Sequence, residues 1–408
     1  MINSFPPLAL AVLAIGAVTL LATLGRAGLA RLGLPDAIGY LLIGLALNLA
    51  DGELEILSGE AGYALEVLAA AGIVILLFRV GLESNPSKLL RQLPKASFAL
   101  VGSIVPSAVL GYLAVRYWLG GDLIPALFVG TALTATSVGV SLAVWREVGA
   151  IDSDNGALLL DLAELDDIAG VILMAFLLSI VPLLRGGPEL NIETSILGEA
   201  GWLILKLAGL SALCLLFAQF LEQKVTRWLG RIEANPAPVI PVAGLGLVVA
   251  ALAGLMGFPL AIGALFAGLA FSRDPRHVKL DKAFETLSRF FVPFFFVGIG
   301  LKVDMSLLTT ALGAGSILFV IAVVAKFAGT AFPVLVTSGG ASALLIGASM
   351  VPRAEIAMII MERGHSLGDW AVPPELYGSM VFVVLGTCLL TPPIARCILR
   401  QNPQGSRQ

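Results

Sequence analysis

Charged side chains are scarce in this chain, and their scarcity excludes several classes of protein. Only 13% of the 408 residues are charged, whereas 58% are hydrophobic. A sequence with so few polar groups cannot cover the surface of a soluble globule, and nucleic acid is not an expected partner. The apolar residues instead recur in runs of about 20, the length that spans a bilayer as a helix. We therefore predict an all-α polytopic membrane protein.

Cysteine and histidine are rarer still. The three cysteines, Cys214, Cys388 and Cys397, fall in or beside apolar runs, without CxxC spacing or a Cys/His cluster. This pattern speaks against a disulfide framework and against a zinc site. The two histidines, His277 and His365, are expected in loops. We expect no cofactor, and we do not expect the protein to be an enzyme.

Lysine and arginine predict the orientation of the spans. The first segment lacks a basic start and is expected to be a retained span. Candidate spans begin near Pro7, Pro35, Tyr63, Ala96, Leu123, Asn155, Ser195, Pro238, Gly257, Arg289, Met305, Ser342 and Val372. With the N-terminus outside, seventeen basic residues of the loops and tail lie inside and four lie outside. The positive-inside rule therefore predicts thirteen spans in the cell membrane, with the N-terminus outside and the C-terminus in the cytoplasm.

The chain contains an internal repeat of opposite orientation. Residues 33–48 (GLPDAIGYLLIGLALN) and 257–272 (GFPLAIGALFAGLAFS) share nine of sixteen positions, and the copies lie seven spans apart. Two further echoes keep the order, Gly81-Leu82 with Gly300-Leu301 and REVG at 146–149 with MERG at 361–364. Because the second copy comes an odd number of spans after the first, the two copies face opposite sides of the bilayer. The repeat is therefore inverted, as in many secondary transporters.

The repeat aligns two segments that weaken a helix. Residues 134–139 (TATSVG) fall opposite 349–354 (SMVPRA). Corresponding interruptions in the two halves of a transporter indicate broken helices whose ends meet at a midplane ion site. Pro352, Arg353 and Glu355 are expected to support the crossing backbone ends rather than to carry ions.

Asp166 and Asp167 lie in the middle of an apolar span, where ionised carboxylates are costly unless they are paired, hydrated or bound to a cation. Neighbouring helical residues point about 100° apart, so the two are expected to have different roles. Lys326 lies in another apolar run, and Asp166 is its obvious partner. The pair is interpreted either as a switch, in which Lys326 loses a proton when the cation arrives, or as a static salt bridge.

An acidic stripe precedes Asp167 on the same span. Asp161, Glu164 and Asp167 recur at intervals of three, which places them along one side of a helix. We interpret Asp161 and Glu164 as a hydrated cytoplasmic funnel, or alternatively as interface or capping residues.

Monovalent hard cations prefer oxygen ligands, which are expected here from Asp167, Thr134, Thr136 and Ser137. Protons bind the same carboxylates when the cation is absent. One site with mutually exclusive occupants is enough for antiport.

Six motifs resemble those of the monovalent cation:proton antiporter-2 family, in its short Na+/H+ exchanger branch. In chain order they are ILLFRVGLES (75–84), TATSVGVSLAVWREVGAI (134–151), LAELDDIAGVILM (162–174), FFFVGIGLKVD (294–304), AKFAGT (325–330) and MVPRAEIAMII (350–360). The resemblance covers nearly the whole chain. Kef-type relatives carry Gln-Asp at the position of Asp166-Asp167 and append a soluble nucleotide-binding domain, so Asp166 and the short tail favour the exchanger branch.

The resemblance implies a homodimer that works by an elevator-like displacement. Its dimerisation domain would comprise 1–92 and 233–303, its ion-translocating core 93–190 and 304–400, with a linker helix at 191–232 and a cytoplasmic tail at 401–408. Asp167 would be the essential carboxylate that binds the monovalent cation, and Asp166 the partner of Lys326. Exchangers with this pair and a lysine typically export one Na+ for two protons.

Rival functions remain for a sequence of this kind. A K+/H+ antiporter of the same fold differs only in selectivity, which the residues do not fix. A Na+-coupled organic-anion symporter can also use crossed broken helices, but it would not need a lysine facing an aspartate. An intramembrane aspartyl protease needs two carboxylates that converge on one water, whereas adjacent helical residues diverge. The expected partners are thus Na+ or another monovalent cation, protons, membrane lipids and a second copy of the chain.

Overall fold

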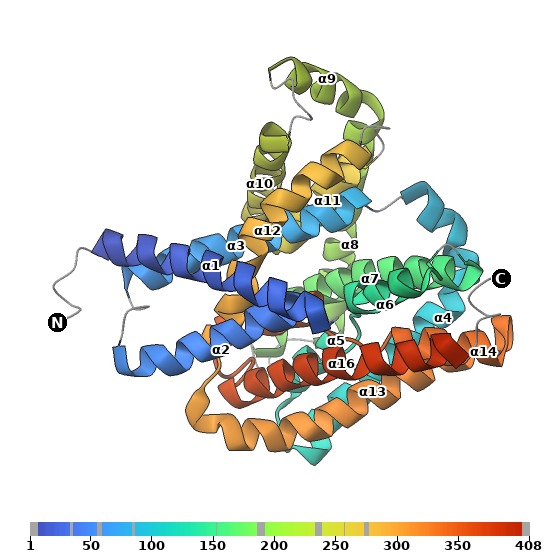
Figure 1. Cartoon of the computed structure of the whole chain (residues 1–408). Helices are drawn as coiled ribbons and strands as arrows, with labels where there is room; N and C mark the ends of the chain where they lie inside the picture. The colour runs from blue at the N-terminus through green and yellow to red at the C-terminus, as the bar shows by residue number, and fades with distance from the viewer. Residues whose placement is uncertain are drawn as a thin grey trace. The chain divides into compact units, whose positions relative to one another are not determined.

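The computed structural model describes residues 7–32, 36–54, 59–83, 86–151, 153–185, 192–232, 239–256, 258–272 and 277–401, which form helices and no strand. Its elements in chain order are α1 (Pro7–Leu32), α2 (Asp36–Leu54), α3 (Glu60–Glu83), α4 (Pro86–Leu113), η2 (Ala114–Trp118), α5 (Leu123–Ala132), α6 (Val138–Val148), α7 (Asp154–Arg185), α8 (Ile192–Leu216), η3 (Phe217–Leu221), α9 (Glu222–Ile232), α10 (Val239–Leu255), α11 (Leu260–Phe271), α12 (His277–Leu301), η4 (Met305–Leu307), α13 (Leu308–Ser338), α14 (Gly340–Ser349), α15 (Glu355–Leu367) and α16 (Pro374–Gln401) (Figure 1).

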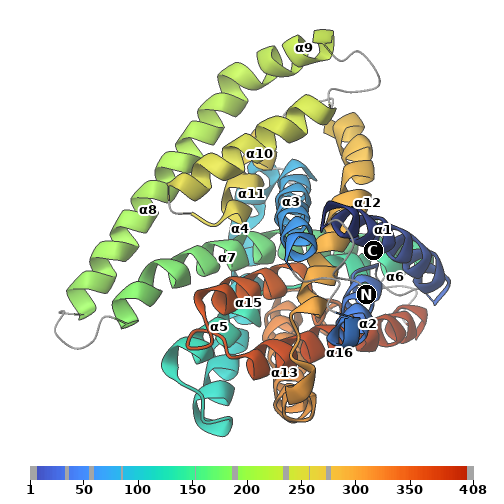
Figure 2. The ribbon, with the colours of Figure 1, turned by 90° about the vertical axis from the view of Figure 1, so that its left-hand side faces the viewer.

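The fold is that of an all-helical, polytopic membrane protein. Within the described residues, seven helices are long and apolar enough to cross a bilayer, and five shorter apolar helices accompany them. Two pairs, α5 with α6 and α14 with α15, are single spans interrupted in the middle. Figure 2 shows α8 and α9 as one long rod joined through η3. Counted in this way, the described helices correspond to the thirteen segments of the sequence.

Helix boundaries differ from the expected ones where charge meets the apolar runs. α4 begins at Pro86 and α12 at His277, well before the expected starts at Ala96 and Arg289. Both segments in between are charged, and the helix continues beyond its apolar part in each, through Pro94 in α4 and without any Pro or Gly in α12, which hydropathy alone does not detect. For the same reason the expectation that both histidines lie in loops is wrong. His277 starts α12, and His365 lies in the last turn of α15.

The chain divides into two compact units. The first unit comprises Met1–Ala22, Ala46–Lys88 and Leu178–Gly298, and the second comprises Thr23–Leu45, Leu89–Leu177 and Ile299–Gln408. The divisions after Lys88, Leu177 and Gly298 compare with expected boundaries after residues 92, 190 and 303. Residues 191–232, expected as a separate linker, fall in the first unit, and the Thr23–Leu45 segment falls in the second. The role of either unit in dimerisation or transport stays a prediction.

In the first unit, α3 packs along α11. The contact is close because both helices present glycine: a Cβ at Gly81 would lie 2.2 Å from the Leu265 carbonyl oxygen, and one at Gly268 would lie 2.0 Å from the Phe78 oxygen. Small residues at helix crossings let backbones approach in this way when no hydrophobic effect drives association within a membrane. Phe78 also stacks on Phe284, with ring centroids 5.0 Å apart.

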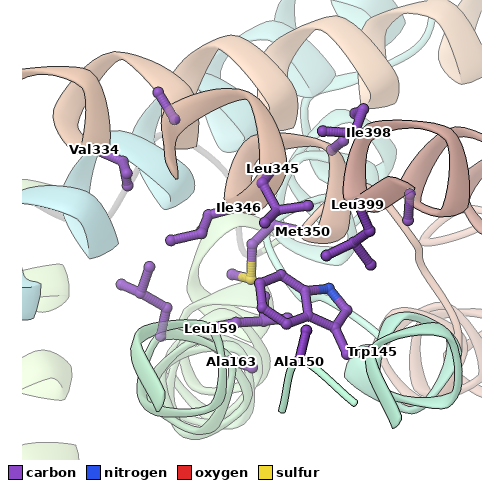
Figure 3. Close-up of a cluster of buried hydrophobic side chains, with 14 of the residues drawn as sticks. Trp145, Ala150, Leu159, Ala163, Val334, Leu345, Ile346, Met350, Ile398 and Leu399 are labelled. Carbon is purple, nitrogen blue, oxygen red and sulfur yellow. The ribbon is translucent and has the colours of Figure 1, made fainter. Parts of the chain in front are cut away.

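In the second unit, α13 runs beside α16 and packs on α14 (Figure 1). Both α6 and α15 pack on α16, and α15 also packs on α5. A buried cluster joins these helices, with Trp145 of α6 lying against Met350 and beside Leu399 (Figure 3). Gly300 meets α2 in this unit, where its Cβ would lie 2.6 Å from the Leu41 oxygen. This approach explains why the end of α1 and the first half of α2 group with the second unit.

Candidate ion-binding site

The two interrupted spans meet at their interruptions in the second unit. Residues 133–137 separate α5 from α6, and residues 350–354 separate α14 from α15. The backbone N–H of Ser137 donates to the Pro352 oxygen at 2.8 Å, and the Thr136 hydroxyl donates to the Met350 oxygen at 3.3 Å. Broken helices within a membrane protein must satisfy their freed backbone groups internally. Here each interruption satisfies part of the other.

Asp166 of α7 lies beside this crossing and is fully buried. Lys326 Nζ donates to both carboxylate oxygens, at 2.9 Å to Oδ1 and 2.7 Å to Oδ2. Thr136 Oγ1 donates to Oδ2 at 2.6 Å, and Ser103 Oγ of α4 donates to Oδ1 at 3.2 Å. The ion pair expected between Asp166 and Lys326 is thus present. With four hydrogen bonds from three donor groups on its two oxygens, this carboxylate has little capacity left for another ligand.

Lys326 also binds the end of a broken helix. Its Nζ donates to the Thr134 backbone oxygen at 2.5 Å, just past the last residue of α5. Helix C-termini carry partial negative charge and unsatisfied carbonyls, so a cation is favourable there. The fully buried ammonium is therefore compensated twice, by the Asp166 carboxylate and by the end of α5.

Asp167 has a different environment from its neighbour. It is half-buried, and its Oδ1 is inaccessible to solvent yet has no hydrogen-bond partner among the described residues. Asp166, Glu355, Lys326 and Glu164 are all near enough to act on it electrostatically. A buried oxygen without a donor costs free energy unless a proton or a cation occupies it. Asp167 is therefore the carboxylate of this site with open coordination capacity.

Glu355 brings a second carboxylate to Asp167, a proximity that the sequence did not indicate. It is the first residue of α15, where the partial positive charge of a helix N-terminus stabilises an anion. Glu355 is half-buried, and the Ser137 side chain is near enough to act on its carboxylate. Glu355 therefore brings carboxylate oxygens near Asp167, and the supporting role expected from its sequence position stays a prediction.

Arg353 binds backbone oxygens at the second interruption. Its Nη1 donates to the Met350 and Pro352 oxygens at 3.2 and 3.4 Å, next to the end of α14. Its own N–H donates to Thr387 Oγ1 at 3.1 Å, and Cys388 Sγ lies 3.1 Å from its carbonyl oxygen. Both of these partners belong to α16. The loop at 350–354 is thereby tied to a continuous helix.

The remaining predicted residues fall into two groups. The Thr134 hydroxyl donates to the Thr131 oxygen at 2.7 Å within its own helix end, so its carbonyl rather than its hydroxyl faces Lys326. Glu164 acts electrostatically on Asp167, and Asp161 is buried about one turn before Glu164 on α7. Two of the three acidic positions are thus brought together.

Sequence reasoning missed Ser103 and the residues of α16 that hold the interruption. Ser103 and Ser107 stand four residues apart in the apolar run of α4, and Ser107 donates to the Ser103 oxygen at 2.8 Å. A polar pair at helical spacing in a membrane span was the available signal for Ser103. Thr387 and Cys388 carry no comparable signal, because small polar residues are common in membrane helices.

A second set of contacts fixes the end of α14. The Trp145 indole donates to Ser349 Oγ at 3.0 Å, and Ser141 Oγ donates to the Ser349 oxygen at 2.5 Å. Both donors lie on α6, the half-helix that follows the other interruption. The attachment of the second broken span to the first therefore continues beyond the crossing, with the donors on the first span.

Comparison with known proteins agrees with this architecture. A solved structure, that of the sodium proton antiporter MjNhaP1 from Methanocaldococcus jannaschii at pH 8, superimposes with a TM-score of 0.73 over 97% of this chain and 99% of that chain. The two sequences are 17% identical, so the likeness shows the fold.

Relatives by sequence are closer. The high-affinity Na+/H+ antiporter NhaS3 of Synechocystis is 30% identical over 82% of this chain and 71% of its own length. The Na+/H+-K+ antiporter GerN of Bacillus cereus is 30% identical over 90% of both chains, and a Na+/H+ antiporter of Enterococcus hirae is 29% identical over 90% of this chain and 92% of its own. Residues 16–401 match the family described as sodium/hydrogen exchanger, transmembrane. The chain belongs to the sodium/hydrogen exchanger family.

Proposed function

We propose that this protein is a secondary active antiporter that exchanges Na+ for H+ across the cell membrane. The observation that carries the proposal is the contrast between two adjacent carboxylates. Asp166 is saturated by Lys326, Thr136 and Ser103, whereas Asp167 keeps a buried oxygen without a donor. Within a membrane-spanning unit such an oxygen needs a proton or a cation. Competition between the two for Asp167 couples their movements.

The proposed cation ligands are oxygen atoms around Asp167. Glu355 supplies a carboxylate, and Thr134, Thr136 and Ser137 supply hydroxyl or backbone oxygens. Oxygen ligands suit hard monovalent cations, and freed backbone at helix interruptions is the usual source of such ligands in transporters. Asp161 and Glu164 precede the site on α7 as the proposed cytoplasmic funnel.

The exchange is proposed to be electrogenic and to proceed by elevator-like alternating access. A lysine that has a carboxylate partner can release a proton when a cation weakens the pair, so Lys326 is the proposed second proton carrier. The division of the chain into two compact units supports a moving part and a static part. A homodimer, contacts with lipid and an N-out, C-in orientation complete the proposal.

Proton-gradient dissipation in proteoliposomes tests this function. Na+, Li+ and K+ are added separately to the wild type, to Asp167→Asn and to Asp304→Asn. The last is a matched control, because Asp304 is an exposed carboxylate that caps η4 through Ser306. We expect dissipation with Na+ and Li+ in the wild type and in the control, and none in Asp167→Asn although it remains folded.

The alternatives give different outcomes. A response to K+ alone would assign the protein to potassium exchange on the same fold. Wild-type activity of Asp167→Asn would refute the site. No response to any cation between about pH 6 and 9 would favour the organic-anion symporter.

A further inference from the structure

One face of α13 is buried along its middle. Leu318, Ala322, Lys326, Thr330 and Val334 recur every four residues, and each of them is fully buried. Residues at this spacing are neighbours on one side of a helix, with about 5–6 Å between their Cβ atoms. Lys326 and Thr330 are the two polar members of this row, and they follow each other in it.

The hydroxyl of Thr330 differs from those of other threonines in these helices. Thr337, Thr387 and Thr391 each donate to the carbonyl oxygen four residues earlier, at 3.1, 2.8 and 3.0 Å. Such a bond satisfies a hydroxyl within its own helix. Thr330 Oγ1 is inaccessible to solvent and has no hydrogen-bond partner among the described residues. This costs free energy unless a partner reaches the hydroxyl in another state of the transport cycle.

The ammonium group of Lys326 has no bond to spare for Thr330 in this state. Its three N–H groups are used by the two carboxylate oxygens of Asp166 and by the Thr134 backbone oxygen. An ammonium has three donors and no acceptor. A neutral amine has two donors and one lone pair, and that lone pair accepts a hydrogen bond from a hydroxyl. The Thr330 hydroxyl therefore suits the neutral form of its neighbour better than the charged form.

We propose that the Thr330 hydroxyl stabilises the neutral form of Lys326 by donating a hydrogen bond to Nζ. The inference rests on the proposed function, in which a cation arriving at Asp167 weakens the pair between Lys326 and Asp166. One N–H bond of the ammonium then breaks, the proton passes to water, and the electron pair stays on Nζ. Thr330 Oγ1 donates to that electron pair. Because this bond forms only after the proton has left, Thr330 is a positioning residue for proton release.

Other titratable groups near Lys326 also respond to pH. Asp166 and Asp167 of α7 and Arg353 of the second interruption are the charged groups that act on it. Helices α5 and α14 contain no titratable residue. The other titratable side chains on the helices around it, away from the charged helix ends, are Tyr112, Asp161, Glu164, Glu355, Tyr377 and Cys388. A test of Thr330 must therefore leave every one of these charges in place.

The pH dependence of Na+/H+ exchange in proteoliposomes tests the proposal with variants that change only position 330. Thr330→Val keeps the shape of threonine without its hydroxyl, and Thr330→Ser keeps the hydroxyl. We expect Thr330→Val to reach half of its maximal rate about half to one pH unit above the wild type, the size of one hydrogen bond. Without the donor the neutral amine is less stable, so the proton leaves at a higher pH. Thr330→Ser should restore the wild-type profile.

Stability and affinity separate this role from a structural one. The apparent Tm of Thr330→Val should equal or exceed that of the wild type, because a methyl group replaces an unpartnered buried hydroxyl. The KM for Na+ at the alkaline end of the profile should be unchanged, since Lys326 is neutral there with either side chain. Thr391→Val is the matched control: its buried hydroxyl has a partner, the Thr387 oxygen, and its loss should leave the pH profile unchanged.

Two results would overturn the inference and leave the proposed function intact. A wild-type pH profile for Thr330→Val would show that the hydroxyl has no part in proton release. A higher KM for Na+ at every pH would make Thr330 a cation ligand instead. Thr330→Ala also lacks the hydroxyl and decides in the same way if the valine variant does not fold. A wild type that exchanged no Na+ for protons would refute the proposed function, and this inference with it.

Discussion

The two interruptions occupy equivalent positions of the inverted repeat, yet they are built differently. Ser137 and Pro352 are repeat-related, and they meet: the Ser137 N–H donates to the Pro352 oxygen. A symmetric crossing would return a bond from residue 352 to residue 137, but proline has no N–H to donate. The crossing is therefore held from one side, and the second interruption needs other partners.

The buried cations at the two interruptions, Lys326 and Arg353, also have different kinds of hydrogen-bond partner. Lys326 binds the end of α5 and also a carboxylate, Asp166. Arg353 is as deeply buried, but its side-chain hydrogen bonds described here go to backbone oxygens beside the end of α14. One end of the repeat thus combines helix capping with an ion pair, whereas the cation at the other end binds backbone oxygens. The inverted repeat is thus symmetric in its backbone, whereas the charged contacts at its two interruptions are not.

The frame itself is symmetric to the level of single atoms. Gly81 meets the Leu265 oxygen, and Gly300 meets the Leu41 oxygen, the repeat-related atom. Each contact joins a helix of one half to a helix of the other. The halves are therefore interleaved at these two crossings.

Replacement of Lys326 is expected to have the largest effect. Lys326→Gln leaves the buried Asp166 carboxylate without its cation, and breaking one partner out of a buried pair costs about 3–5 kcal/mol. We expect a markedly lower apparent Tm in detergent and a change in charge moved per turnover, measured by solid-supported membrane electrophysiology. Unchanged charge movement would remove Lys326 from the set of proton carriers.

Alanine at the repeat-related glycines tests the symmetry of the frame. Gly81→Ala and Gly300→Ala each drive a methyl group into backbone atoms that cannot yield, and overpacking of this kind costs about 1–3 kcal/mol. Thermal unfolding should show similar losses for both, and none for Gly244→Ala, whose new Cβ would meet nothing within 4 Å. A loss of stability at only one of the two positions would mean that the two equivalent helix crossings do not contribute equally to the stability of the fold.

Replacement of Arg353 should cost less than replacement of Lys326, although both are fully buried cations. Arg353→Gln loses two long hydrogen bonds to backbone, worth about 1 kcal/mol each, and relieves the desolvation of a charge. We expect a modest fall in apparent Tm with Na+/H+ exchange retained in proteoliposomes. A loss of exchange in a stably folded protein would show that Arg353 takes part in transport.

The helices and most of the site residues could be predicted from the sequence, because membrane-spanning helices are long apolar runs in which ionisable residues are conspicuous. Ionisable residues in apolar runs are rare and costly, so Asp166, Asp167 and Lys326 stood out, and the repeat aligned the two interruptions before any coordinates. Ser103 and Thr387 were not accessible in this way. Each acts through a single hydrogen bond across space, and hydroxyl groups are tolerated at almost any position of a membrane helix.

The different environments of Asp166 and Asp167 could be predicted from the sequence only in part. Helical geometry separated the directions of Asp166 and Asp167, but the proximity of Glu355 to Asp167 depends on how α15 begins next to the crossing. That start is set by contacts of Arg353 with α16, 34 residues further along the chain. Long-range contacts of this kind leave no periodic trace in a sequence.

Pro352→Ala is expected to have the smallest effect and to test the asymmetry of the crossing directly. Alanine restores an N–H at position 352 without removing the carbonyl that accepts from Ser137. If the missing N–H of Pro352 has no function of its own, the change in apparent Tm should correspond to less than about 1 kcal/mol, and exchange should persist. Ser137→Pro is the matched opposite, because it removes the N–H that the crossing uses, and it should destabilise more. If Pro352→Ala slows exchange while raising the apparent Tm, the missing donor keeps the second interruption loose enough to move, and the asymmetry itself serves transport.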